Sequence, residues 1–232
     1  MAIRGFKIKS KSLVFLVGFF FGNISVTIFY ALPDNQIKHL LFFLSLFVSN
    51  YFLLVFTNRT FYMEKKSPFF IFFLIIFTAL LSHTILRIID LFPGEWQMTA
   101  FYNIFVCLVL AIPGYWFGYL VLKQYRNIKN ESVEPWIKMR FLIAGIGAIL
   151  EGSVGWLAYL IVISQIPGVD PAGNLELLAL FITVLFLLTF AIGFFIAFVM
   201  PERMKQYFNR NYTTSDDMEL SEEEIMKQMG GE

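Results

Sequence analysis

Long apolar runs separated by short polar breaks set the pattern of this chain. Each run is about 20 to 26 residues long. At about 1.5 Å of rise per residue, a helix of that length crosses roughly 30 Å of hydrocarbon. The pattern therefore predicts an all-α polytopic membrane protein, a bundle of six transmembrane helices. These predicted spans are Leu13–Leu32, Ile37–Thr57, Pro68–Ile89, Met98–Leu122, Met139–Ile163 and Leu175–Met200.

The breaks carry residues that end helices, such as Pro33-Asp34-Asn35 after the first run and Pro93-Gly94 after the third. The first run follows a basic segment, as the apolar part of a signal peptide does. It is too long for a signal peptide, and no small-residue cleavage site precedes Pro33. We therefore expect an uncleaved first span.

Positive charge marks one side of the predicted membrane. Of the 18 Lys and Arg residues, 16 fall in alternate gaps or, in the case of Arg140, at the adjoining end of a span, beginning with the N-terminal segment. Cytoplasmic loops are enriched in Lys and Arg, so both termini are predicted to be cytoplasmic. The opposite loops carry acidic residues instead, namely Asp34, Asp90, Glu95, Asp170 and Glu176. The predicted location is the cytoplasmic membrane, crossed several times.

Composition supports the same class. The chain is 58% apolar and only 15% charged, whereas a soluble domain carries about 25% charge. Its surface partner is predicted to be the lipid bilayer and not a nucleic acid. The single Cys107 excludes a disulfide within one chain.

The chain divides into a transmembrane domain, residues 1–210, and an acidic cytoplasmic tail, residues 211–232. Within the tail, Ser221 and Glu224 have the spacing of a helix-capping box, which makes a short terminal helix possible. We expect the tail to be solvated, because it contributes no apolar stripe.

Glu151 is the most unusual residue, since it lies near the middle of the fifth run, in AILEGSVGW. A lone carboxylate in hydrocarbon is costly, so this side chain must face the bundle interior and be neutral or paired. It is either a polar contact that locks helices together or a ligand or proton site. Both alternatives stay open.

A second polar group ends the third run, in LSHTILRIIDLFPGEW, where His83, Arg87 and Asp90 follow one another at about one helical turn. Arg87 either extends to the membrane surface, with Trp96 in the interfacial aromatic belt, or lines a site. The second interpretation predicts a small ligand-binding site open to the outside. Its candidate residues are His83, Arg87, Asp90, Asn103 and Glu151.

Small residues recur within two runs. Gly18 and Gly22 form a GxxxG pattern, and the fifth run has glycines at 145, 147, 152 and 155. Small residues allow helix backbones to approach closely, so we interpret these as packing contacts. The sequence shows neither an inverted repeat nor a pair of broken helices, the usual signs of a transporter.

No P-loop, dinucleotide-binding glycine pattern, paired-His zinc motif or GxSxG motif occurs. The only histidines are His39 and His83. Two histidines on neighbouring helices could ligate a haem, but these two are predicted to lie at different depths. We expect neither an enzyme nor a cofactor or metal.

The last third resembles a known family. EPWIKMRFLIAGIGAILEG begins a run after a basic stretch, and AIGFFIAFVMPERMKQYFNR ends the final run at a proline and a basic aromatic segment. The region from Glu134 to Arg210 is similar to the multi-span sensory region found ahead of histidine kinases and diguanylate cyclases. That family usually has seven spans and a cytoplasmic output domain, whereas we identify six spans and no output domain.

Two functions follow from these features. The resemblance implies an integral membrane sensory or receptor-like module that acts through a separate cytoplasmic signalling partner or membrane subunit. The alternative is a small transporter or channel subunit with a polar site around Glu151. The sequence leaves the ligand, the partner and the oligomeric state open.

Overall fold

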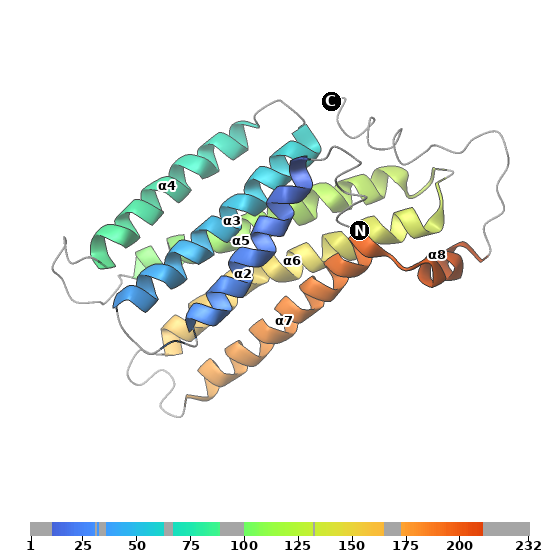
Figure 1. The fold of residues 1–232 in the computed structure, drawn as a ribbon. Coiled ribbons are helices and arrows are strands. Elements are labelled where there is room, and N and C mark those ends of the chain that lie inside the picture. The colour runs from blue at the N-terminus through green and yellow to red at the C-terminus, as the bar shows by residue number, and fades with distance from the viewer. Residues whose placement is uncertain are drawn as a thin grey trace. The chain divides into compact units, whose positions relative to one another are not determined.

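A computed structural model describes residues 11–30, 32, 36–62, 67–88, 100–131, 133–164 and 173–210. Every regular element in this described part is an α-helix, which confirms the predicted all-α class (Figure 1). The helices are α2 (Lys11–Tyr30), α3 (Gln36–Tyr62), α4 (Pro68–Ile88), α5 (Ala100–Ile128), α6 (Pro135–Ser164), α7 (Asn174–Val199) and α8 (Glu202–Asn209).

Each predicted run contains one long helix, but three helices extend beyond the apolar stretch. Helix α3 continues past Thr57, α5 continues past Leu122, and α6 begins at Pro135 instead of Met139. Hydropathy marks only the apolar part of a helix. Polar residues before or after that part can still adopt the helical conformation. Pro135 suits the first helical position, where its missing N–H has no intrahelical partner to lose.

Helix α8 was not predicted. It begins directly after Pro201, whose carbonyl accepts hydrogen bonds from the backbone nitrogens of Met204 and Lys205, at 2.9 and 3.1 Å. The predicted tail helix at Ser221 lies outside the described residues.

Two helices of the described part are long and apolar enough to cross a membrane. They are the Leu40–Tyr62 portion of α3 and the whole of α7, Asn174–Val199. The apolar stretches Val14–Val26 and Pro68–Ser82 are shorter. By length and composition, the described helices therefore support fewer crossings than the six predicted.

The chain folds as two compact units, Met1–Pro113 and Gly114–Glu232. In the first unit, α2 packs along α3, and α4 also contacts α3. The side chain of Ser49 on α3 links the first two helices. Its Oγ donates to the Phe19 carbonyl at 2.8 Å and accepts from Asn23 Nδ2 at 2.8 Å. On another face of α3, Phe47 packs edge-on against Phe77 of α4, with ring centroids 5.5 Å apart.

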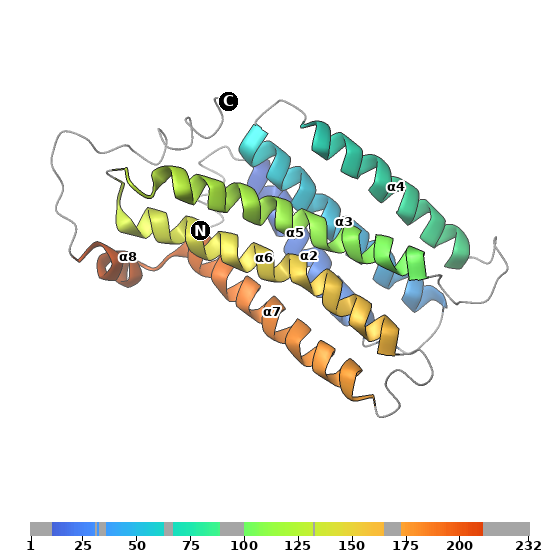
Figure 2. The same cartoon turned by 180° about the vertical axis from the view of Figure 1, so that it is seen from behind.

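In the second unit, α6 runs between α7 and the second half of α5 (Figure 2). Gly147 of α6 faces Phe190 of α7, and the rings of Phe117 and Phe194 join α5 to α7 at 5.5 Å. Helix α5 contains the buried Pro113 as the last residue of the first unit, and this proline cannot donate a backbone hydrogen bond to residue 109. The helices of this unit therefore meet through small residues and aromatic rings.

Glycine at position 22 is expected to be required for the contact of α2 with α3. A Cβ atom there would lie 2.6 Å from Cβ and 2.9 Å from Cα of Ser49, so Gly22→Ala should destabilise the protein by about 1–3 kcal/mol. The matched control is Gly147→Ala, whose new Cβ would meet Phe190 at an ordinary 3.6 Å. Thermal unfolding in detergent should show a lower midpoint for the first variant only, and equal midpoints would contradict this packing.

Candidate functional site

Glu151 lies buried in the contact between α5 and α6. The residue is 7% exposed. Among the residues that the structure describes, no other acidic or basic side chain is buried. The other buried polar residues are Ser49, Asn50, Thr57, Asn58 and Ser67. The prediction that Glu151 faces the interior of its bundle is confirmed.

The carboxyl group lies where a side chain at position 114 would otherwise stand. A Cβ atom on Gly114 would collide with Oε2 of Glu151, and it would also lie 2.6 Å from the backbone nitrogen of Gly152 and 2.8 Å from the Ala148 carbonyl. One turn further along α5, a Cβ on Gly118 would meet Ile149 at 2.8 Å. The close approach of the two backbones thus depends on glycine at both α5 positions, and the first of them makes room for the carboxyl.

The nearby hydroxyl groups have hydrogen bonds of their own. Ser153 Oγ donates to the Ile149 carbonyl at 2.9 Å, and Tyr115 Oη lies 3.1 Å from the same Oγ. Because a serine hydroxyl has one hydrogen, Tyr115 is the donor in this second bond. Neither hydroxyl is bonded to Glu151. Oε2 of Glu151 is buried without a hydrogen-bond partner among the described residues.

A buried polar atom without a partner costs about 1–3 kcal/mol, and a charged group costs more. A carboxyl group in this position can take up a proton or hold a cation, since either would supply the missing partner. No group of three or more His, Cys, Asp and Glu side chains comes together in the described residues. This site therefore differs from the multi-ligand sites that bind transition metals.

The other four predicted site residues cannot be placed around Glu151. The backbones of His83 and Arg87 lie in α4 and that of Asn103 lies in α5, but their side chains are outside the described part, and Asp90 is outside it entirely. The side chain of His39, considered for haem ligation, is also outside it. The outward-facing polar cluster therefore stays a prediction.

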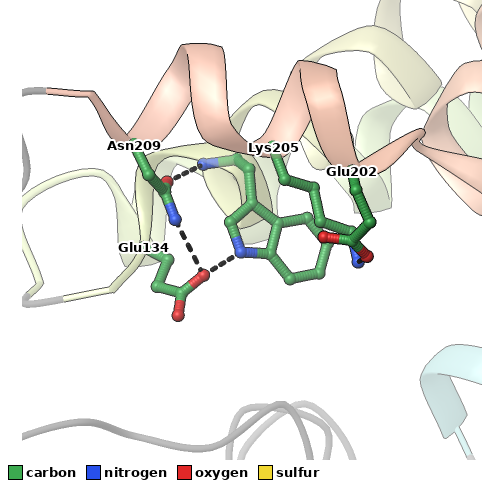
Figure 3. A network of polar contacts seen from close by, with 5 residues as sticks. Glu134, Glu202, Lys205 and Asn209 are labelled. Carbon is green, nitrogen blue, oxygen red and sulfur yellow. Dashed lines mark hydrogen bonds and ion pairs between the residues drawn. The ribbon is translucent and has the colours of Figure 1, made fainter.

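A second polar network joins α8 to the start of α6 (Figure 3). Glu134 Oε2 accepts hydrogen bonds from Asn209 Nδ2, at 3.1 Å, and from Trp136 Nε1. Asn209 Oδ1 in turn accepts from the backbone nitrogen of Trp136 at 3.3 Å. The Lys205 ammonium lies 4.7 Å from the centre of the Trp136 ring and 2.9 Å from Glu202.

The backbone N–H of Trp136 lies in the first turn of α6, where it has no partner within the helix, and Asn209 supplies the acceptor that it needs. Trp136 also packs against the buried cluster of Ile128, Val133 and Ile137 at the α5–α6 turn. Helix α8 is therefore fastened to the same end of α6 that receives the chain from α5. Glu134 and Asn209 are 75 residues apart, and no local pattern in the sequence indicates their contact.

Sequence reasoning also missed Gly114 and Gly118, although they form a GxxxG pattern in GYWFG. That pattern was the available signal.

No protein-family model matches the chain, and no curated protein or solved structure matches it significantly. The resemblance to the sensory regions of histidine kinases and diguanylate cyclases thus stays a prediction.

Asn209→Ala should release α8 from α6, because it removes both the acceptor of the Trp136 N–H and a donor to Glu134. A loss of about 1.4 kcal/mol would speed amide hydrogen exchange in residues 202–209 about 10-fold. Hydrogen exchange read by mass spectrometry in detergent measures this. Gln206→Ala, an exposed position on the same helix, is the control and should leave exchange unchanged. Equal protection in both variants would show that the network does not hold α8.

Proposed function

We propose that the chain is a multi-pass integral protein of the cytoplasmic membrane, with six spans and both termini in the cytoplasm. Helix α7 gives the strongest support, since one face of it carries eight large apolar side chains that are half-exposed or more, whereas Ala179, Phe190, Phe194 and Ala197 are buried. The exposed side chains are Leu177, Leu178, Phe181, Val184, Leu185, Leu188, Ile192 and Phe195. Soluble proteins rarely expose so large an apolar patch, whereas lipid would cover it favourably.

The charge distribution supports the same placement. Exposed cations gather at the ends of helices predicted to be cytoplasmic, among them Lys123, Arg126 and Lys129 at the end of α5 and Arg203 and Arg210 around α8. Helix α8 follows α7 after only Met200 and Pro201. In this topology α8 lies at the inner membrane surface, where aromatic and basic side chains are favoured.

Within that membrane, we infer the function of a small transporter or channel subunit whose ligand is held at Glu151. The observation that carries this proposal is the buried carboxyl with an unpartnered oxygen in the middle of α6. Ionisable residues inside membrane spans are costly and mark ion pathways and proton relays. A purely structural contact would not require a carboxyl, because an apolar side chain of similar size would fill the space without an unsatisfied atom.

A sensory module acting through a cytoplasmic partner is the second candidate, and the α6–α8 network favours it. A change at Glu151 alters the packing of α6, and the first turn of α6 contains Trp136, to which α8 is fastened. In this version α8 and the tail beyond it form the surface read by the signalling partner. The sensory function predicts ligand-dependent exposure of α8 without any flux.

Purified protein in liposomes separates the two functions and tests the role of Glu151. We expect proton or monovalent-cation flux in the wild type and its loss in Glu151→Gln, because glutamine keeps the shape but cannot ionise. Glu151→Leu should also abolish flux while keeping or raising the unfolding midpoint, since it removes an unsatisfied polar atom. Glu131→Gln, an exposed position in the α5–α6 turn, is the control.

Flux that persists in Glu151→Gln would show that the carboxyl is a packing residue. A wild type without flux, but with α8 exchange that changes on acidification or cation addition, would favour the sensory module.

Topology is tested with reporter fusions. Fusions at Gly5 and at Glu232 should both report the cytoplasmic side, and an insertion between Val169 and Asn174 should report the outside. Termini on opposite sides would exclude an even number of spans.

A further inference from the structure

One face of helix α8 is fixed against the start of α6. Glu202, Lys205 and Asn209 recur at intervals of three and four residues, so their side chains share one side of the helix (Figure 3). On that side the Lys205 ammonium lies 4.7 Å from the centre of the Trp136 ring, and Asn209 accepts the backbone N–H of Trp136. These contacts determine how α8 is rotated about its own axis.

That rotation exposes a second set of side chains, Arg203, Tyr207 and Arg210. They are spaced by four and three residues, so they form one stripe along the helix, and all three are exposed. The Arg210 guanidinium lies 4.7 Å from the centre of the Tyr207 ring, which holds the end of the stripe together. We call these three residues the basic stripe.

The two positive charges of the basic stripe have no ion-pair partner among the described residues. Glu202 is the acidic residue of α8, and its carboxylate lies 2.9 Å from the Lys205 ammonium. The nearby Glu134 accepts hydrogen bonds from Asn209 and Trp136 on the α6 side. Both carboxylates are therefore engaged elsewhere, and the stripe presents uncompensated positive charge.

The remaining side of α8 is apolar. Met204 and Phe208 lie one helical turn apart and are partly buried. Apolar side chains on one side and exposed cations on another are typical of a helix that lies in a membrane surface. Since α8 follows the lipid-facing α7 after only Met200 and Pro201, the stripe lies at the level expected for lipid headgroups.

We propose that the basic stripe is a binding site for the headgroup of an anionic phospholipid in the inner leaflet. Each guanidinium offers N–H donors in a planar fork that matches two phosphate oxygens, and the tyrosine hydroxyl can donate a further hydrogen bond. At about 1.5 Å per residue, Arg203 and Arg210 begin about 10.5 Å apart along the helix, so the headgroup lies between them, over Tyr207.

This inference rests on the cytoplasmic placement of α8 in the proposed function and goes beyond it by assigning a lipid ligand. It also gives the α6–α8 network a role. By fixing the rotation of α8, the network turns both arginines away from α6 and toward the lipid. Uncompensated charge on an ordered helix loses less conformational entropy on binding than the same charge on a disordered segment.

Lipid binding is measured on the full chain in neutral detergent, titrated with phosphatidylglycerol or with the zwitterionic phosphatidylcholine, and bound lipid is counted by native mass spectrometry. The wild type should bind phosphatidylglycerol more tightly. The double variant Arg203→Gln/Arg210→Gln should weaken that binding about 30-fold, since each cation near an anionic surface contributes about a factor of 5. Binding of phosphatidylcholine should not change.

The matched control is Arg126→Gln/Lys129→Gln, which removes the same charge from exposed positions at the end of α5. It should leave the affinity for phosphatidylglycerol near the wild-type value. A second double variant, Arg203→Lys/Arg210→Lys, keeps the charge and removes the planar forks, so it should weaken binding several-fold. All these side chains are exposed, so unfolding midpoints should stay equal and show that every variant folds.

Equal losses in the α8 and α5 double variants would show diffuse attraction to charge and would overturn the site. Full affinity in the lysine variant, or equal binding of the two lipids by the wild type, would overturn it as well. If tight phosphatidylglycerol binding appears only after truncation beyond Arg210, the acidic tail occupies the stripe, and the proposal fails for the full chain.

The placement of α8 fails separately from the lipid site. A reporter fusion at Glu232 that reports the outside would overturn the inner-leaflet assignment, whatever the binding measurements in detergent show. Loss of flux or its persistence in Glu151→Gln does not bear on the basic stripe, because binding to the stripe is read without flux.

Discussion

The close approach of helix backbones at paired glycines is the constraint on which this protein depends. At Gly114 the approach leaves a space that the Glu151 carboxyl enters, and at Gly22 a similar approach brings Ser49 against α2. Because glycine has no Cβ, the polar side chain on the neighbouring helix, Ser49 on α3 or Glu151 on α6, can enter the contact between the two helices and stay buried there. The same feature therefore fastens each helix pair and determines which polar group is buried there.

The two contacts differ in how well their polar groups are satisfied. Ser49 both donates and accepts at 2.8 Å, so the contact of α2 with α3 is closed and structural. Glu151 keeps one oxygen without a partner in the described part, and in a medium of low dielectric constant such an atom is expensive. An expensive group can be retained when its partner is a transient ligand. This difference is the physical reason for assigning transport chemistry to α6.

The sequence predicted the all-α class, the place of each long helix and the burial of Glu151. Long apolar runs gain free energy when they leave water, and a lone carboxylate within such a run is too costly to face hydrocarbon. The sequence pattern underestimated α3, α5 and α6, since polar residues can extend a helix beyond its apolar part. It missed the fastening of α8 to Trp136, a contact between residues distant in the chain that no spacing rule encodes.

The most direct test of the central claim is labelling of Glu151 by a hydrophobic carbodiimide, which reacts with protonated carboxyl groups in apolar surroundings. The protein is treated in native membranes, and the modified residue is located by mass spectrometry. The account predicts modification at Glu151 that falls progressively as Na⁺ or K⁺ is raised, because a bound cation keeps the carboxylate from being protonated. An unreactive Glu151, or modification that neither cation reduces, would contradict a cation site at the α5–α6 contact.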